Sequence, residues 1–250
     1  MHRFYITPEN WNPEALALEG GEAHHAQDVL RLKTGDRAVV FNGQGVEATV
    51  EIVSVEKNRV GLRLLHKSAT APLPCRITLA QAVPKGKNME MILEKATELG
   101  AACIVPLLSE RTVIQLDAGE AAKKQEKWQG AVVEACKQCG QNRLPVVERP
   151  QTPREFFAAN PRHDLMLIAS LQPDAVHFKT VLADYCAASQ GKRPASVLIL
   201  VGPEGDFTPA EISLAKGSGC RPITLGPIIL RSETAAIYCL SMLGFELLSA

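Results

Sequence analysis

Two apolar segments near the carboxyl end of the chain, each followed by a glycine turn, constrain the fold most. Residues 197–201 form a continuous run of Val, Leu and Ile, and Gly202 and Gly205 follow it. Such a run has the length and β-branched content of a buried parallel strand. Residues 220–225 repeat the pattern, with Gly226 directly after them. Because ligands of open α/β sheets collect at the carboxyl ends of strands, we expect the two turns to lie side by side at a ligand site.

A helix start follows each of these turns. Thr208, Pro209 and Glu211 stand at the spacing of a capping box with proline in the first helical position, which predicts a helix from there. Ser232 is predicted to cap an apolar helix that runs from Glu233 to about Leu248. The order strand, glycine loop, helix therefore occurs twice.

The chain lacks the glycine spacings of the common nucleotide-binding loops. It contains neither G-x-G-x-x-G nor G-x-x-x-x-G-K-[ST], and the segment 84–87 does not have the spacing of a phosphate cradle. Taken singly, each glycine turn is more often an ordinary turn after a strand. The occurrence of both favours a ligand site.

The rest of the chain predicts two domains. Residues 1 to about 70 contain a short helix near 21–30 and then closely spaced strands with tight turns, which indicates a small β-barrel. The two prolines of segment 68–74 indicate a linker. From Cys75 onward strands alternate with helices, which is typical of an α/β domain with a largely parallel sheet. We therefore expect domains at 1–70 and 75–250.

The paired turns carry a resemblance to a known family. Gly202-Pro203-Glu204-Gly205, followed by Leu225-Gly226 and by Leu230-Arg231-Ser232-Glu233-Thr234-Ala235, resembles the signature of the SPOUT RNA methyltransferases. The bacterial small-subunit (16S) ribosomal RNA uridine-N3 methyltransferases are the most similar group. Shorter segments extend the likeness over nearly the whole chain: Arg3–Tyr5, His25–Arg31, Lys85–Glu90, Lys95–Gly100, Arg111 and Glu134–Gly140. The paired motifs are specific, whereas the short segments are individually weak.

The resemblance implies a fold that sequence rules alone do not favour. It implies a SPOUT-type α/β domain with a mostly parallel sheet and a C-terminal trefoil knot, preceded by a PUA-like β-barrel that binds RNA. Because true knots are rare, the strand and helix pattern by itself would predict an unknotted Rossmann-like sheet.

The resemblance also implies an activity and its residues. The expected protein is an enzyme that transfers a methyl group from S-adenosylmethionine to N3 of a specific uridine in 16S ribosomal RNA. It is expected to act as a homodimer on the RNA or on the assembled small subunit. Arg231 is the candidate catalytic residue, with an ion pair to Glu233 or to a neighbouring helix as the alternative. Glu204 could be a base or a loop-fixing acceptor for nearby backbone N–H groups, and the second interpretation is favoured. The candidate cofactor-binding residues are Leu171, Val201, Gly202, Gly205, Leu225, Gly226 and Leu230, and the candidate RNA-binding residues are Arg3, His25, Arg31, Lys85, Arg111 and Arg143.

Four positions depart from the family pattern. Asp206 stands where glycine is common, Ile228 where arginine is frequent, and Lys137 and Gln141 where glutamate and arginine are frequent. Two other functions remain open: a SPOUT enzyme that acts on another RNA or on a ribose 2′-hydroxyl, and a non-catalytic RNA-binding ribosome assembly factor. The intact segment from Arg231 to Thr234 argues against the second.

The amino-acid composition limits which partners the protein can bind and in which compartment it works. The formal net charge is zero, so an RNA-binding surface must be a local patch. Seven cysteines, an odd number in a chain that needs no cross-links, indicate a reducing compartment, and no apolar run is long enough for a membrane span. We expect a cytoplasmic protein without membrane contact. Cys136 and Cys139 form the C-x-x-C of the chain but have no second pair of metal ligands nearby in the sequence, and His24-His25 likewise lacks one, so no metal site is expected.

Overall fold

The computed structural model describes residues 1–86, 88–112, 114 and 116–249. Lys87, which belongs to one of the short segments quoted above, lies outside these ranges. The chain forms two compact units, one made of residues 1–72 and 133–144 and the other of residues 73–132 and 145–250. The first unit therefore includes a segment from the middle of the chain that has no strand pattern.

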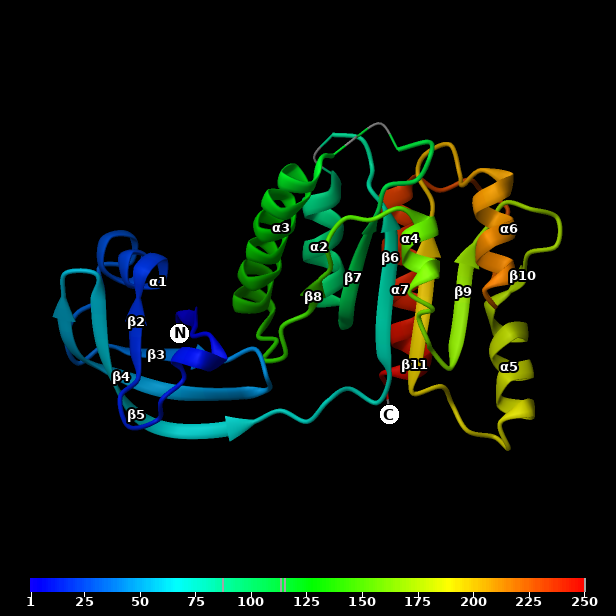
Figure 1. Cartoon of the computed structure of the whole chain (residues 1–250). Coiled ribbons are helices and arrows are strands. Elements are labelled where there is room, and N and C mark those ends of the chain that lie inside the picture. The colour runs from blue at the N-terminus through cyan, green and yellow to red at the C-terminus, as the bar shows by residue number, and fades with distance from the viewer. Residues whose placement is uncertain (87, 113, 115, 250) are drawn as a thin grey trace. The chain divides into compact units, whose positions relative to one another are not determined.

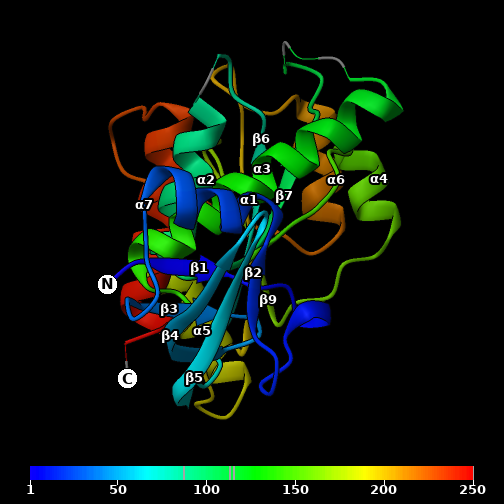
Figure 2. The ribbon, with the colours of Figure 1, turned by 90° about the vertical axis from the view of Figure 1, so that its left-hand side faces the viewer.

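The first unit is a strongly bent five-stranded sheet with a short helical segment (Figure 2). The strand order is β1-β3-β4-β5-β2, in which β1 and β3 run parallel and the other pairs are antiparallel. The strands are β1 (Arg3–Tyr5), β2 (Ala17–Glu19), β3 (Arg37–Phe41), β4 (Val46–Glu56) and β5 (Arg59–Ala69). The helical segment consists of α1 (Gly20–His24) and a π-helical turn, His25–Val29, and a short 3-10 turn covers Pro8–Asn10. The small β domain and its helix near residues 21–30 are confirmed.

The second unit contains a fully parallel seven-stranded sheet, which confirms the α/β prediction. Its order is β10-β12-β9-β11-β6-β7-β8. The strands are β6 (Arg76–Ala82), β7 (Ala101–Leu107), β8 (Val146–Val147), β9 (Leu165–Ala169), β10 (Val176–His177), β11 (Ser196–Val201) and β12 (Arg221–Thr224). β11 lies between β6 and β9, so both of its edges are paired, and residues 197–201 are all buried because helices cover both faces of the sheet (Figure 1). This central position explains why its sequence is continuously apolar rather than alternating.

Helices cover both faces of this sheet (Figure 1). They are α2 (Asn88–Glu98), α3 (Ala118–Cys139), α4 (Pro153–Ala158), α5 (Phe178–Ala188), α6 (Pro209–Gly217) and α7 (Ser232–Leu247). α7 packs on α2, β6 and β11. On the other face, Phe156 of α4 and Ile212 of α6 share a hydrophobic core with Leu198 and Leu200 of β11. The side chains of β11 alternate between these two cores.

The capping predictions have mixed outcomes. Thr208 and Thr152 each form a complete capping box with the glutamate three residues later. The prediction that Ser232 caps the last helix is wrong, because Arg231 is the N-cap residue and Ser232 is the first helical residue. The Ser232 hydroxyl is instead used for a contact across the fold, described below.

The chain after β12 crosses back toward the middle of the sheet. β12 pairs with β9, whereas α7, which follows it after a short loop, packs on β6 and β11. The C-terminal trefoil knot stays a prediction. In the described part of the chain, no helix has both the length and the apolar character needed to cross a membrane.

Candidate functional site

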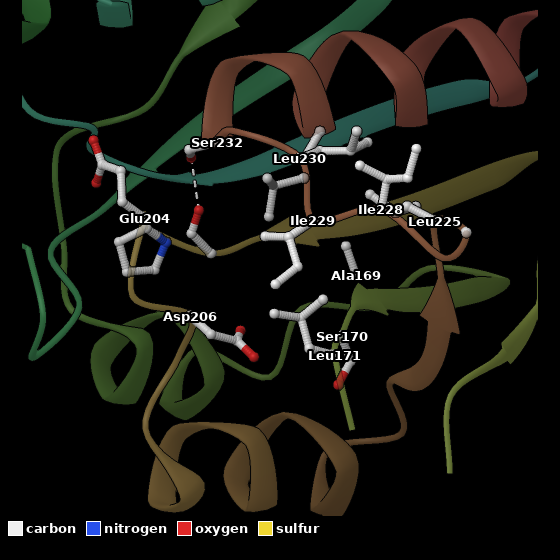
Figure 3. A pocket seen from close by; sticks show the side chains of 15 residues that line it. Ala169, Ser170, Leu171, Glu204, Asp206, Leu225, Ile228, Ile229, Leu230 and Ser232 are labelled. Atoms are coloured by element: carbon white, nitrogen blue, oxygen red, sulfur yellow. Dashed lines mark hydrogen bonds between the residues drawn. The ribbon is translucent and has the colours of Figure 1, made fainter. Parts of the chain in front are cut away.

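A pocket lies where β9, β11 and β12 end, between the loops that follow them and the first turn of α7 (Figure 3). Gly202 and Gly226 both line it, so the two glycine turns meet as the sequence predicts. The loop after β9 supplies a third wall through Ser170 and Leu171. The lining residues are Ala169, Ser170, Leu171, Val201, Gly202, Pro203, Glu204, Asp206, Leu225, Gly226, Ile228, Ile229, Leu230, Ser232 and Ala235.

Most of the residues that the resemblance implied for the cofactor line this pocket. They are Leu171, Val201, Gly202, Leu225, Gly226 and Leu230. Gly205 is not part of the lining, and its carbonyl oxygen accepts a hydrogen bond from Arg111. The sequence does not predict Ser170 or Ile229 as lining residues, and it marks Ile228 only as a departure from the family pattern; all three lie in loops that follow strands.

Three large apolar side chains that line the pocket are exposed to solvent. Leu171, Ile228 and Ile229 are 61%, 74% and 75% exposed. Clusters of exposed apolar side chains around a concave site mark ligand-binding surfaces. In the described residues, the N–H groups of Ile228, Ile229 and Leu230 donate to no protein acceptor. The pocket therefore combines exposed apolar side chains with a lining segment whose N–H groups have no acceptor among the described residues.

Backbone conformation explains two residue types in these loops. Gly226 has φ +112°, which favours glycine, and its N–H donates to Thr224 Oγ1 at 3.2 Å. Asp206 also has a positive φ, +60°, and this left-handed geometry explains why glycine suits the position in the family pattern. The Asp206 carboxylate holds the turn by accepting the Phe207 N–H at 2.7 Å.

Glu204 fixes a neighbouring loop. Its Oε1 accepts the backbone N–H of Lys85 at 3.1 Å, which joins the loop after β11 to the loop after β6. This contact confirms the interpretation of Glu204 as a loop-fixing acceptor. The contact uses only the backbone of Lys85, which is an exposed residue.

Ser232 ties three elements together behind the pocket. Its hydroxyl donates to the Gly202 carbonyl oxygen at 2.7 Å (Figure 3) and accepts from Gln81 Nε2 at 2.9 Å. Ser232 and Gln81 are both buried. The first turn of α7 is thereby fastened to the ends of β11 and β6.

We expect Ser232→Ala to destabilise the protein by about 1–3 kcal/mol, since it leaves the partly buried Gly202 carbonyl and the buried Gln81 amide without this partner. Urea unfolding measures the change. Ser218→Ala is the matched control, because the Ser218 hydroxyl donates only to Leu214 O within its own helix end, at 2.9 Å. The control is expected to stay within about 0.5 kcal/mol of the wild type, and an equal loss in both variants would contradict a fastening role for Ser232.

Arg231 directly follows the pocket residue Leu230 but is not itself part of the lining. As the N-cap of α7 it is exposed, and its carbonyl oxygen accepts the Ala235 N–H at 2.8 Å. No ion pair between Arg231 and Glu233 occurs within the residues that the structure describes. Arg231 is therefore flanked in the chain by the lining residues Leu230 and Ser232, and within the described residues it lacks the ion pair to Glu233 or to a neighbouring helix that the alternative requires.

In the first unit, two of the predicted RNA-binding arginines have protein partners. The Arg3 side chain, 15% exposed, donates to Glu47 Oε2 at 2.9 Å and to Asn142 Oδ1 at 2.6 Å, and lies over the Phe41 ring. Burial acts to raise the pKa of the Glu47 carboxyl and is the largest single influence on it. Hydrogen bonds from Arg3 help to outweigh burial, so the pKa of Glu47 lies below its usual value. The Arg143 guanidinium donates to the Thr70 carbonyl oxygen at 2.9 and 3.1 Å. These contacts give both arginines a structural role.

The other two candidates in this unit are placed differently. His25 is partly buried and meets Phe4 edge to face, with the ring centroids 6.0 Å apart. Arg31 is exposed and has a positive φ of 54°. Of the four, Arg31 is thus the one whose charge is most open to a phosphate.

Comparison with known proteins identifies relatives over the full length. The profile of an RNA methyltransferase domain matches residues 71–244, and that of an RNA methyltransferase PUA domain matches residues 18–65. The ribosomal RNA small subunit methyltransferase E of Bacillus subtilis is 31% identical over 98% of this chain and 97% of its own length. The protein of the same name from Synechocystis is 34% identical over 97% of this chain and 77% of its own length.

Solved structures agree with this assignment. The ribosomal RNA small subunit methyltransferase E of Neisseria gonorrhoeae, bound to S-adenosylmethionine, is 31% identical with a TM-score of 0.84, over 98% of both chains. A methyltransferase from Legionella pneumophila, solved with bound S-adenosylmethionine, is 36% identical with a TM-score of 0.86, over 98% of this chain and 97% of its own.

Proposed function

The chain belongs to the RNA methyltransferase family, and from this premise we propose that it methylates N3 of a specific uridine in small-subunit ribosomal RNA. It is an enzyme, and its cofactor is S-adenosylmethionine. The observation that carries the proposal is the pocket between the two glycine turns, in a chain that resembles ribosomal RNA methyltransferases from end to end.

The pocket fits this cofactor chemically. Exposed Leu171, Ile228 and Ile229 provide apolar contact for an adenine ring, and the free N–H groups of residues 228–230 provide donors for its ring nitrogens. Gly202 and Gly226 let the backbone approach the ligand closely. Bound there, S-adenosylmethionine would supply a methyl group carried on a positively charged sulfur. N3 of the uridine loses its proton and accepts this methyl group in line with the sulfur–carbon bond that breaks.

The chain's own residues must then orient the base and hold its charge. Loss of the N3 proton spreads negative charge over O2 and O4 of the uracil, and a guanidinium aimed at those oxygens stabilises it. Arg231 is the proposed residue, because it lies in the chain between the lining residues Leu230 and Ser232 and makes no ion pair with Glu233 in the described residues. Uracil must also leave its stack to reach such a site.

Incubation with labelled S-adenosylmethionine and undermodified small subunits tests the proposed reaction. Nucleoside mass spectrometry is expected to show 3-methyluridine in the small-subunit RNA. A 2′-O-methylated nucleoside, or label in a different RNA, would favour the alternative SPOUT activities. Binding of cofactor and RNA without any transfer would favour an assembly factor.

We place the reaction in the cytoplasm, because small-subunit ribosomal RNA is the substrate. The first unit, of which residues 18–65 match an RNA methyltransferase PUA domain, is proposed to bind this RNA, and 1–70 and 75–250 are the domain boundaries that we propose in the sequence. Arg31 is the proposed phosphate contact of that unit.

The outer face of α7 supports a homodimer. Tyr238 and Phe245 on this helix are 48% and 77% exposed, and Met91 of the adjoining α2 is exposed as well. Three large apolar side chains on two packed helices need a cover in water. A second copy of the chain is the proposed cover, and each RNA is proposed to contact both chains.

Mixing two defective full-length variants tests the sharing of RNA between chains. We expect Arg231→Ala subunits, which keep Arg31, to restore activity when mixed with Arg31→Gln subunits, which keep Arg231. One of the two sites in such a mixed dimer has both arginines. Sedimentation at assay concentration serves as the control, and a fully active monomer would rule the dimer out.

A further inference from the structure

The loop after β11, residues 202–208, is held by side chains that lie outside the pocket. Glu204 and Asp206 of this loop are among the residues that line the pocket (Figure 3). Two charged residues from other segments, Arg111 and Glu211, contact the loop or its end. Neither of them lines the pocket.

Glu211 is a buried carboxylate that joins two segments. It is 7% exposed, and one oxygen accepts the Thr208 N–H at 2.9 Å and the Thr208 hydroxyl at 3.2 Å. The other oxygen accepts the N–H of Glu110 at 2.9 Å. A capping box needs only the first of these oxygens. The second therefore links the start of α6 to the loop after β7, and these bonds offset the cost of burying the charge.

Arg111 continues this link from the next residue along the chain. Its Nη1 donates to the carbonyl oxygen of Gly205 and, at 3.5 Å and more weakly, to that of Asp206. A Cβ added to Gly205 would lie 3.5 Å from Arg111 Cδ, so the arginine stem runs close along the turn. The sequence predicts Arg111 as an RNA contact, but its guanidinium is turned onto the backbone of the pocket loop.

We infer that Arg111 and Glu211 are positioning residues for the cofactor. Together with the Glu110 N–H they form a loop clasp, which holds residues 202–208 in the shape that makes one wall of the pocket. The clasp acts through the loop and touches no ligand. The inference rests on the proposed function only for the identity of the cofactor, because the hydrogen bonds themselves are independent of it.

Three variants separate the clasp from an RNA contact. Arg111→Ala removes the donors, and Arg111→Lys keeps the charge and one donor. Glu211→Gln replaces one of the two accepting oxygens with an NH₂ group, which cannot accept the N–H of Glu110 or of Thr208. Arg149→Ala is the matched control, because Arg149 also donates to a backbone carbonyl, that of Ala118 at 2.9 Å, but away from this pocket. Hydrogen exchange of the free protein, followed by mass spectrometry, reports the loop without any ligand, and calorimetry reports cofactor affinity.

We expect exchange in the 202–208 segment to rise about tenfold or more in Arg111→Ala and Glu211→Gln, with a comparable rise in the dissociation constant for S-adenosylmethionine. Arg111→Lys should recover part of both, and Arg149→Ala should change neither. RNA affinity and its salt dependence should stay at the wild-type values. Unchanged loop exchange would overturn the clasp, and a salt slope lower by about one would assign Arg111 to a phosphate instead. A wild type that fails to bind S-adenosylmethionine would refute the proposed function, while the exchange data would still decide the clasp.

Discussion

Replacing Arg231 with alanine is expected to lower turnover by roughly a hundredfold or more while the dissociation constant for S-adenosylmethionine changes by no more than several-fold. The magnitude is that of removing one oriented donor from a developing negative charge. The arginine stands beside the pocket rather than in its lining, so its loss leaves the apolar contacts and backbone donors in place. Single-turnover methylation of small subunits and calorimetry with the cofactor measure the two quantities separately.

Arg154→Ala is a suitable control for this prediction, because Arg154 is an exposed arginine on α4 in the same unit. It removes the same charge at a different place and should leave turnover unchanged. Arg231→Lys should fall between the alanine variant and the wild type, since lysine keeps the charge but loses the planar fork of donors. Normal turnover of Arg231→Ala would show that another group holds the charge on the base.

The parts of the site that the sequence could predict are local. The apolar run 197–201, the turns at Gly202 and Gly226 and the capping box at Thr208 are each formed by neighbours in sequence. Their meeting in one pocket follows from a general rule of parallel sheets, which places the ends of all strands at one edge.

The parts that could not be predicted depend on contacts between distant segments. The partners of Arg111 lie about ninety residues away along the chain, and Ser232 meets Gln81 across an even longer separation. A serine before an apolar helix has the pattern of a cap, and nothing nearby shows that a buried glutamine will take its hydroxyl instead. Likewise, an arginine such as Arg3 is a natural candidate for an RNA contact, and only the structure shows that its side chain donates to Glu47 and Asn142.

Strand length limited the fold prediction in the same way. β1 and β2 have three residues each and β10 has two, which is too short for an alternating pattern. Residues 133–144 join the first unit although they include the last turns of α3, whose first part belongs to the second unit. Packing decides which compact unit a segment belongs to, and the periodicity of apolar residues along a helix does not show it.

Gly202→Val is expected to abolish measurable binding of S-adenosylmethionine, with the dissociation constant raised by roughly a hundredfold or more. A Cβ at this position would lie 3.3 Å from Asp206 Oδ1, from Phe207 Cδ2 and from the Phe207 backbone nitrogen. Since Phe207 is buried and cannot move freely, the loop must shift, and the two methyl groups of valine add further crowding. The Gly202 carbonyl would then lose its alignment with the Ser232 hydroxyl. Calorimetry measures the affinity, and circular dichroism with thermal unfolding shows whether the sheet is retained.

Gly130→Val separates this local effect from the general cost of replacing a glycine. Gly130 lies in α3, and a Cβ there would meet nothing within 4 Å. Valine is a better helix former than glycine, so this variant should bind the cofactor normally and be at least as stable as the wild type. A folded Gly202→Val protein that binds S-adenosylmethionine as tightly as the Gly130→Val control would mean that the cofactor does not occupy the pocket between β9, β11 and β12. The role proposed for Arg231 would then fail with it, and so would the effect of the loop clasp on cofactor affinity, whereas the hydrogen exchange data would still decide whether the clasp holds the loop.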